Sequence, residues 1–168
     1  MEELLAAGAN VDVRDLKEWS MLDTAATEGR EDVMKVLLRH GGDTNSCDSN
    51  GFTALHVAAG VDGSVRDNGG VVRFLLEAGA DIEARTTDTY TPLHITADCL
   101  KPSTSSGVMC ALLEGGADTS ASSRFEWTSL HLACRRSNVA GVELLLRWGA
   151  DEKTRGDDGC VAEHLMGV

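Results

Sequence analysis

The sequence predicts an all-α solenoid built from stacked helix-turn-helix units. Two short phrases recur along the 168 residues. The first is Gly-Phe-Thr-Ala-Leu-His-Val-Ala-Ala at residues 51–59, and it returns at 90–97, at 127–133 and, in altered form, at 19–26. The second is a Leu-Leu pair followed by glycine and then Asp or Asn. A chain that repeats one phrase is a row of small units, so its function is expected in a surface rather than in a buried pocket.

The second phrase sets the length of one unit. Its glycines, Gly8, Gly41, Gly79, Gly116 and Gly149, are 33, 38, 37 and 33 residues apart. From each of the first four glycines, the leucine of the next first phrase follows after 14 residues. Extra length therefore enters only inside the helical part, at residues 60–70 and 99–107, and we expect two flexible loops there, each joining the helices of its own unit. They either extend a binding surface or are neutral insertions.

The first phrase predicts the short helix that opens each unit. Thr91 suits the cap because its hydroxyl can accept from free N–H groups, and Pro92 suits the first turn. The alanines that follow allow close helix packing. Truncation of Leu93 to alanine should cost about 2–5 kcal/mol, the usual range for a core leucine.

The segment before each glycine predicts the second helix. Residues 71–76 are apolar almost all round, as expected of a helix buried between neighbours. Gly79 fits a left-handed helix terminus, where a side chain would cost about 1–2 kcal/mol.

These phrases resemble the ankyrin repeat, whose pattern is roughly D-x-x-G-x-T-P-L-H-x-A-A and then an apolar helix ending in L-L-x-x-G-A-D. The resemblance covers almost the whole chain. It implies an ankyrin-repeat solenoid with β-hairpin-like turns between units, shaped like a cupped hand with the turns as fingers and the first helices as the palm. Three positions depart from the pattern: Asp23 replaces the first motif histidine, Thr96 an alanine and Gly141 an apolar residue.

We expect a single domain over residues 1–168. It would hold a partial unit at 1–14, units at about 15–47, 48–85, 86–122 and 123–155, and a partial unit at 156–168. Both ends look either cut from a longer array or like short caps. Glu163 stands where the motif leucine belongs, which suits a solvent-facing last unit.

The net charge of −12 argues against nucleic-acid and anionic-membrane binding. The sequence has no signal segment and no apolar run that could span a bilayer. Its five cysteines are odd in number and scattered, which indicates reduced thiols. We therefore expect an intracellular, cytoplasmic protein, with the nucleus as the alternative.

Nothing in the sequence indicates catalysis, a metal or a cofactor. Histidines 56, 94, 131 and 164 share one repeat position, which favours a structural hydrogen bond repeated along the stack. The cysteine and histidine spacings match no zinc module, and no nucleophile motif or phosphate-binding loop occurs. We expect no enzyme activity and no small-molecule substrate.

Aromatic residues gather at one position of the repeat. Of the seven in the chain, four stand directly before the residue that caps the first helix, namely Trp19, Phe52, Tyr90 and Trp127. One interpretation is structural, with rings stacked to shield the turns. The other is a solvent-facing row of the kind that anchors protein interfaces. The resemblance favours the second, because the family tolerates many residue types here.

The fourth full unit adds positive charge to this row. Arg124 and Phe125 precede Trp127, and Arg135 and Arg136 end the helix that follows. We expect all five to face the cup and to receive a partner segment in which an acidic residue adjoins a hydrophobic one. The alternative is an ordinary solvated surface.

Asn45 follows Leu37 by eight residues in the turn after a second helix. It is similar to the asparagine that an intracellular asparaginyl hydroxylase modifies in some ankyrin proteins. The alternative is a plain turn asparagine.

The sequence therefore predicts a protein-protein interaction module that binds a protein or peptide through its palm and finger tips. The alternative is the recognition segment of a larger enzyme or channel, such as a ubiquitin-ligase subunit or a kinase.

Overall fold

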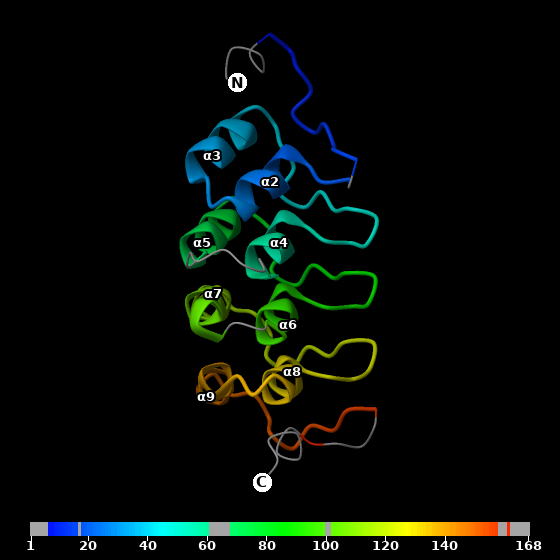
Figure 1. Cartoon of the computed structure of the whole chain (residues 1–168), viewed down its shortest axis with the longest axis vertical. Coiled ribbons are helices and arrows are strands. Elements are labelled where there is room, and N and C mark those ends of the chain that lie inside the picture. The colour runs from blue at the N-terminus through cyan, green and yellow to red at the C-terminus, as the bar shows by residue number, and fades with distance from the viewer. Residues whose placement is uncertain (1–6, 17, 61–67, 100–101, 158–160, 162–168) are drawn as a thin grey trace.

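The structure is a computed structural model that describes residues 7–16, 18–60, 68–99, 102–157 and 161. Its helices form four pairs (Figure 1). The first helices are α2 (Met21–Thr27), α4 (Ala54–Gly60), α6 (Pro92–Ala97) and α8 (Ser129–Arg135). The second helices are α3 (Glu31–Arg39), α5 (Gly69–Glu77), α7 (Pro102–Glu114) and α9 (Val139–Arg147). Of the expected partial units at the two ends, residues 1–6 of the first and residues 158–160 and 162–168 of the last lie outside the described residues.

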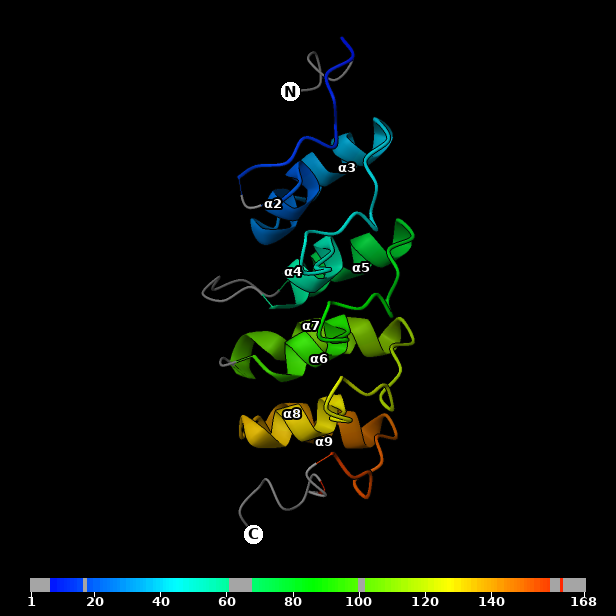
Figure 2. The same ribbon diagram turned by 90° about the vertical axis from the view of Figure 1, so that its right-hand side faces the viewer.

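The pairs stack in one open row, as the repeat predicts. First helices form one layer and second helices the other, and the turns between units project from the side of the first helices (Figures 1 and 2). We call these projecting turns the fingers and the exposed side of the first helices the palm. Within the described residues there are no named strands, but isolated antiparallel bridges such as Cys47 with Thr53 and Ser122 with Thr128 make four fingers hairpin-like. The expected all-α solenoid is confirmed.

The core runs between the two layers along the whole stack. The motif leucines Leu55, Leu93 and Leu130 are each at most 1% exposed. One leucine of each second helix is buried in the same way, namely Leu37, Leu75, Leu112 and Leu145, and every residue of α4 before Gly60 is buried. Each unit packs on its neighbours through these side chains, so no unit buries its apolar surface alone.

The expected histidine role is confirmed for the units in which both contacts are described. His94 Nδ1 lies 3.2 Å from the backbone nitrogen of Thr91 and accepts its hydrogen, which caps α6. His94 Nε2 lies 3.0 Å from the carbonyl oxygen of Trp127 in the next unit. His56 makes the equivalent contacts with Thr53 and with Tyr90.

The remaining positions of the histidine series differ. His131 makes the capping contact with Thr128, but its Nε2 has no partner among the described residues. Cys160, the residue at the matching place in the next finger, lies outside them, as does His164. In the first unit Asp23 takes over the cap, since its Oδ2 accepts 2.7 Å hydrogen bonds from the backbone and hydroxyl of Ser20.

The glycines of the second phrase have a left-handed backbone conformation, as predicted. Gly79 has a φ of 88°, and a Cβ there would meet nothing within 4 Å. The restriction at this position is therefore conformational rather than steric.

The prediction of a flexible loop at residues 99–107 is wrong for most of its length. Residues 102–107 belong to α7, which runs for 13 residues from Pro102, so Ser103 to Ser106 are helical rather than part of a flexible insertion. Proline fits the first turn, and extending a helix that already packs between α5 and α9 needs no new nucleation. Of the other insertion, Gly60 ends α4 and Gly69 begins α5, while residues 61–67 lie outside the described residues.

Candidate protein-binding surface

The four rings of the predicted row occupy equivalent places on the stack. Trp19, Phe52, Tyr90 and Trp127 are all half-buried, and each directly precedes the residue that caps a first helix. Tyr90 stacks on His94 with ring centroids 5.7 Å apart, Trp127 stacks on His131 at 6.2 Å, and Phe52 contacts His56 at 5.6 Å with its ring tilted. Each of these three rings thus has one side fixed by an imidazole and part of its surface open, which combines features of both interpretations.

Backbone hydrogen bonds hold neighbouring fingers side by side. The Thr87 nitrogen donates to the Asn50 carbonyl oxygen at 2.9 Å, and the Asp157 nitrogen donates to that of Phe125 at 3.2 Å. The side chain of Arg85 reaches across to the carbonyl oxygen of Ser122 at 2.9 Å. Such contacts fix the spacing of the rings, so the row is largely preformed.

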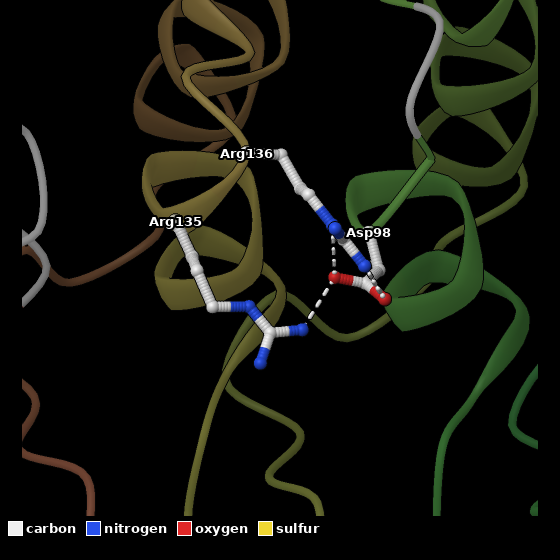
Figure 3. Close-up of polar contacts among 3 residues, drawn as sticks. All are labelled: Asp98, Arg135 and Arg136. Carbon is white, nitrogen blue, oxygen red and sulfur yellow. Dashed lines mark hydrogen bonds and ion pairs between the residues drawn. The ribbon is translucent and has the colours of Figure 1, made fainter.

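Asp98 joins the third and fourth units at the end of the palm. It lies at the end of α6, directly opposite Arg135 and Arg136 at the end of α8 (Figure 3). Arg136 donates to both carboxylate oxygens at 2.8 and 2.9 Å, and Arg135 donates to one at 2.6 Å. Burial alone would raise the pKa of Asp98, but the hydrogen bonds from the two guanidinium groups hold it below its ordinary value.

The predicted basic and aromatic residues of the fourth unit are partly brought together. The Arg135 guanidinium lies 4.9 Å from the centre of the Trp127 ring, and Phe125 is 53% exposed beside them. Arg124 forms an exposed contact of 3.6 Å with Asp88 in the preceding finger. Arg135 therefore reaches Trp127, whereas Arg124 turns to a neighbouring unit.

The two carboxylates that pair with these arginines were not predicted from the sequence, and they are Asp88 with Arg124 and Asp98 with Arg135 and Arg136. Asp98 could have been found by register, because it occupies the same repeat position as Arg135 one unit earlier, seven residues after the capping threonine. Stacked repeats bring equivalent positions together, so opposite charges there predict a contact between units. The arginines thus present less free positive charge than their sequence suggests.

Two hollows lie along the ring row. The first has a volume of about 290 Å³ and is lined mainly by apolar groups of Trp19, Phe52, Val57 and Ile95. The second, of about 240 Å³, is lined by Tyr90, Phe125, Trp127, Arg135 and Asp157. A larger hollow of about 540 Å³ lies against α2 and α3 and shares only Trp19 with the row.

Asn45 connects the first two full units. Its side-chain nitrogen donates to the carbonyl oxygen of Gly79 at 3.3 Å, and its side-chain oxygen accepts from the Asp81 nitrogen at 2.7 Å. Both ends of the amide are therefore engaged in structure, although the residue is exposed. Hydroxylation of Asn45 stays a prediction, which a mass gain of one oxygen atom after treatment with the hydroxylase would test.

Other classes of site have little support in the part of the chain that is described. There, no three His, Cys, Asp or Glu side chains gather as metal ligands, and no helix is long and apolar enough to cross a membrane. Cys47, Cys99, Cys110 and Cys134 are all free thiols.

Comparison with known proteins defines the class of this chain. A family model described as ankyrin repeats, in three copies, matches residues 1–86 and again 64–157. The chain therefore belongs to the ankyrin repeat family, whose repeats form modules that bind other proteins.

Named relatives place the repeat in several larger proteins. Human ankyrin repeat and SOCS box protein 6 is 43% identical over 91 residues, which cover 52% of this chain and 22% of that protein. The chicken nuclear factor NF-kappa-B p105 subunit is 32% identical over 130 residues, with 58% and 13% covered. The Arabidopsis thaliana potassium channel AKT1 is 33% identical over 85 residues, with 51% and 9% covered. The chain thus spans about a fifth or less of the length of these relatives.

Proposed function

We propose that this chain binds a protein or peptide partner through the ring row and the palm beside it. The observation that carries the proposal is the repetition of one half-open ring in four successive units. Three of these rings are backed by a buried histidine that is also bonded to its own helix cap. Trp and Tyr are enriched among the residues that dominate binding energy at protein interfaces.

Preorganisation is the proposed mechanism. Because the fingers are hydrogen-bonded to one another and the first helices are packed in a row, the side chains lose little freedom when a partner binds. Binding energy then comes from the ring surfaces and hollows, without a catalytic step. The free thiols of the described residues fit a reducing compartment, and on that basis we propose a cytoplasmic location, with the nucleus as the alternative.

Affinity capture from a native lysate tests the proposal. The purified chain is immobilised beside the variants Trp127→Ala and Phe125→Ala, with Val139→Ala as the matched control. Val139 is 62% exposed and lies on α9, in the helix layer away from the fingers. Loss of a specific protein with the aromatic variants alone is the expected result. Equal capture by all of the variants would refute the proposal.

An acidic group in the partner remains our proposal for the fourth unit. It now requires Arg135 or Arg136 to leave Asp98, or to share its hydrogen bonds with a second carboxylate. The double variant Arg135→Gln with Arg136→Gln tests this proposal, because glutamine removes both positive charges without placing a new negative charge beside Asp98. Unchanged capture by the glutamine variant, with its helix content intact, would exclude these arginines.

The second candidate is the recognition segment of a larger enzyme or channel. The short coverage of every relative named above supports it, one of those relatives being a potassium channel by name. Sequencing of the full-length transcript decides the matter, since a catalytic or membrane domain beyond either end favours this candidate.

A further inference from the structure

The two hollows of the ring row differ in lining but share one face of the stack. Both include residues of the row, Trp19 and Phe52 in the first and Tyr90 and Trp127 in the second. The first is centred on the second full unit, and the second on the fourth. A single partner segment lying along the row would therefore meet both.

Their separation follows from helix packing. First helices of adjacent units pack directly on one another, as α4 does on α6 and α6 on α8. Packed helices lie about 8–10 Å apart, so hollows two units apart are separated by about 16–20 Å. An extended chain advances about 3.3 Å per residue, which makes this about six residues at the upper end of the range.

The direction of the side chains in an extended peptide also favours a spacing of six residues. In a strand, residues separated by an even number of positions point to one side, and in a polyproline II helix the period is three. Positions i and i+6 satisfy both patterns. Each hollow has room for one apolar side chain, and the first offers no charged group that would oppose it.

The charge along the fingers indicates which residues the partner segment carries besides its two anchors. Carboxylates outnumber basic residues in every finger, and the chain as a whole has a net charge of −12. Arg85, one of the finger bases, donates to the carbonyl oxygens of Thr89 and Ser122, and its single charge is outnumbered by the three carboxylates of its own finger, Asp81, Glu83 and Asp88. A segment that follows the row is thus complementary if it carries lysine or arginine.

We propose that the partner segment is an extended peptide with apolar anchors at positions i and i+6 and basic residues between them. The acidic group proposed for the fourth unit lies outside this interval, beside the second anchor. This inference rests on the proposed function and specifies its partner. Phe52 and its neighbours receive one anchor, and Phe125 with Trp127 receive the other. Arg135, held by Asp98, forms the polar boundary of the second hollow.

Selection from a displayed library of random peptides tests the inference. The probe is the immobilised full chain, and the readout is the sequence pattern enriched over an empty surface. We expect apolar residues six positions apart with excess lysine or arginine. A synthetic peptide with that pattern should bind about 10- to 100-fold more weakly when either anchor becomes alanine.

Variants assign each anchor to its hollow. Phe52→Ala should remove the preference for one anchor and Trp127→Ala that for the other, whereas Val139→Ala should remove neither. If Trp127→Ala reduces helix content, Phe125→Ala tests the second hollow, since that ring is 53% exposed.

The contrary outcomes are distinct. Absence of enrichment, anchors at another spacing, or enrichment of acidic residues between the two anchors would overturn the inference. If the aromatic variants still lose a protein from the lysate in that case, the proposed function stands and only the peptide partner is wrong. If the aromatic variants capture the same proteins as the wild type, both the proposed function and the peptide inference are wrong.

Discussion

His94 Nε2 lies 3.0 Å from the carbonyl oxygen of Trp127, so a buried imidazole of one unit holds the finger that carries a ring of the next. We predict that His94→Ala lowers the free energy of unfolding by about 2–4 kcal/mol, because it removes this bond, the capping bond to Thr91 and buried volume. Urea denaturation measures the change. His40→Ala, at an exposed site, should stay within about 0.5 kcal/mol of the wild type. Equal effects of the two substitutions would show that the buried histidine is not structural.

The same contacts predict how stability depends on pH. Burial lowers the pKa of His94 from 6.5 to about 4, and burial also lowers that of His56. A histidine with a lowered pKa resists protonation in the fold, so its contribution is complete above pH 6.5 and is lost as pH falls toward 4. The urea midpoint of the wild type should therefore fall over that range. His94→Gln should fall less steeply, and an identical slope would contradict the assignment.

Asp23 offers a stabilising substitution. It is 2% exposed, its Oδ1 has no partner in the described part of the chain, and burial raises its pKa. We predict that Asp23→His restores the bond to the next finger, at the Phe52 carbonyl oxygen, and adds about 1 kcal/mol of stability at neutral pH. The wild type should also lose stability as pH rises above 3.8, and the variant should lack this loss. A lower melting temperature for the variant would contradict the prediction.

A left-handed residue in the third finger predicts a second gain. Thr89 has a φ of 63°, and its buried hydroxyl has no hydrogen-bond partner among the described residues. Gly51 occupies the equivalent place with a φ of 78°. Thr89→Gly should raise the unfolding free energy by about 1 kcal/mol, since a branched residue is strained in this conformation.

Gly51→Ala is the matched opposite of that change. A Cβ there would approach the Arg85 carbonyl oxygen and the Thr86 Cα, both at 3.0 Å, so the variant should be less stable. Calorimetry of the two variants checks both directions. Two shifts of the same sign would show that the strain argument is wrong.

The Asp98 contacts predict a coupling between units. Asp98→Ala and Arg136→Ala should each destabilise the chain, and the double variant should lose less than their sum by about 0.5–1 kcal/mol, as for partly exposed ion pairs. A double-mutant cycle in urea gives this energy. Zero coupling would mean that the bidentate contact adds nothing to stability.

Much of the fold could be predicted because each unit repeats the same local physics. Pro92 and Thr91 specify a helix start, and Gly79 specifies a helix end, whatever lies around them. The second insertion could not be placed in the same way. Its serines read as a loop, yet Pro102 and packing against the neighbouring units extend α7 through them.

The candidate site was predictable in position but not in its contacts. Trp127 directly precedes the residue that caps α8, and this position in the repeat faces the palm side in every unit, so its location could be predicted from the sequence. The partners of Arg124 and Arg135 depend on which side chains of the adjacent unit come within reach. That depends on stacking between units, which a pattern within one unit does not contain.

Site-specific photo-crosslinking tests the central claim most directly. A photoreactive phenylalanine analogue replaces Phe125 in one sample and Val139 in another, since both sites are exposed but Phe125 lies in a finger and Val139 begins α9 in the other helix layer. After irradiation with the captured partner, we predict a crosslinked product from position 125 and none from position 139. A product from position 139 alone would mean that the partner binds elsewhere than the ring row.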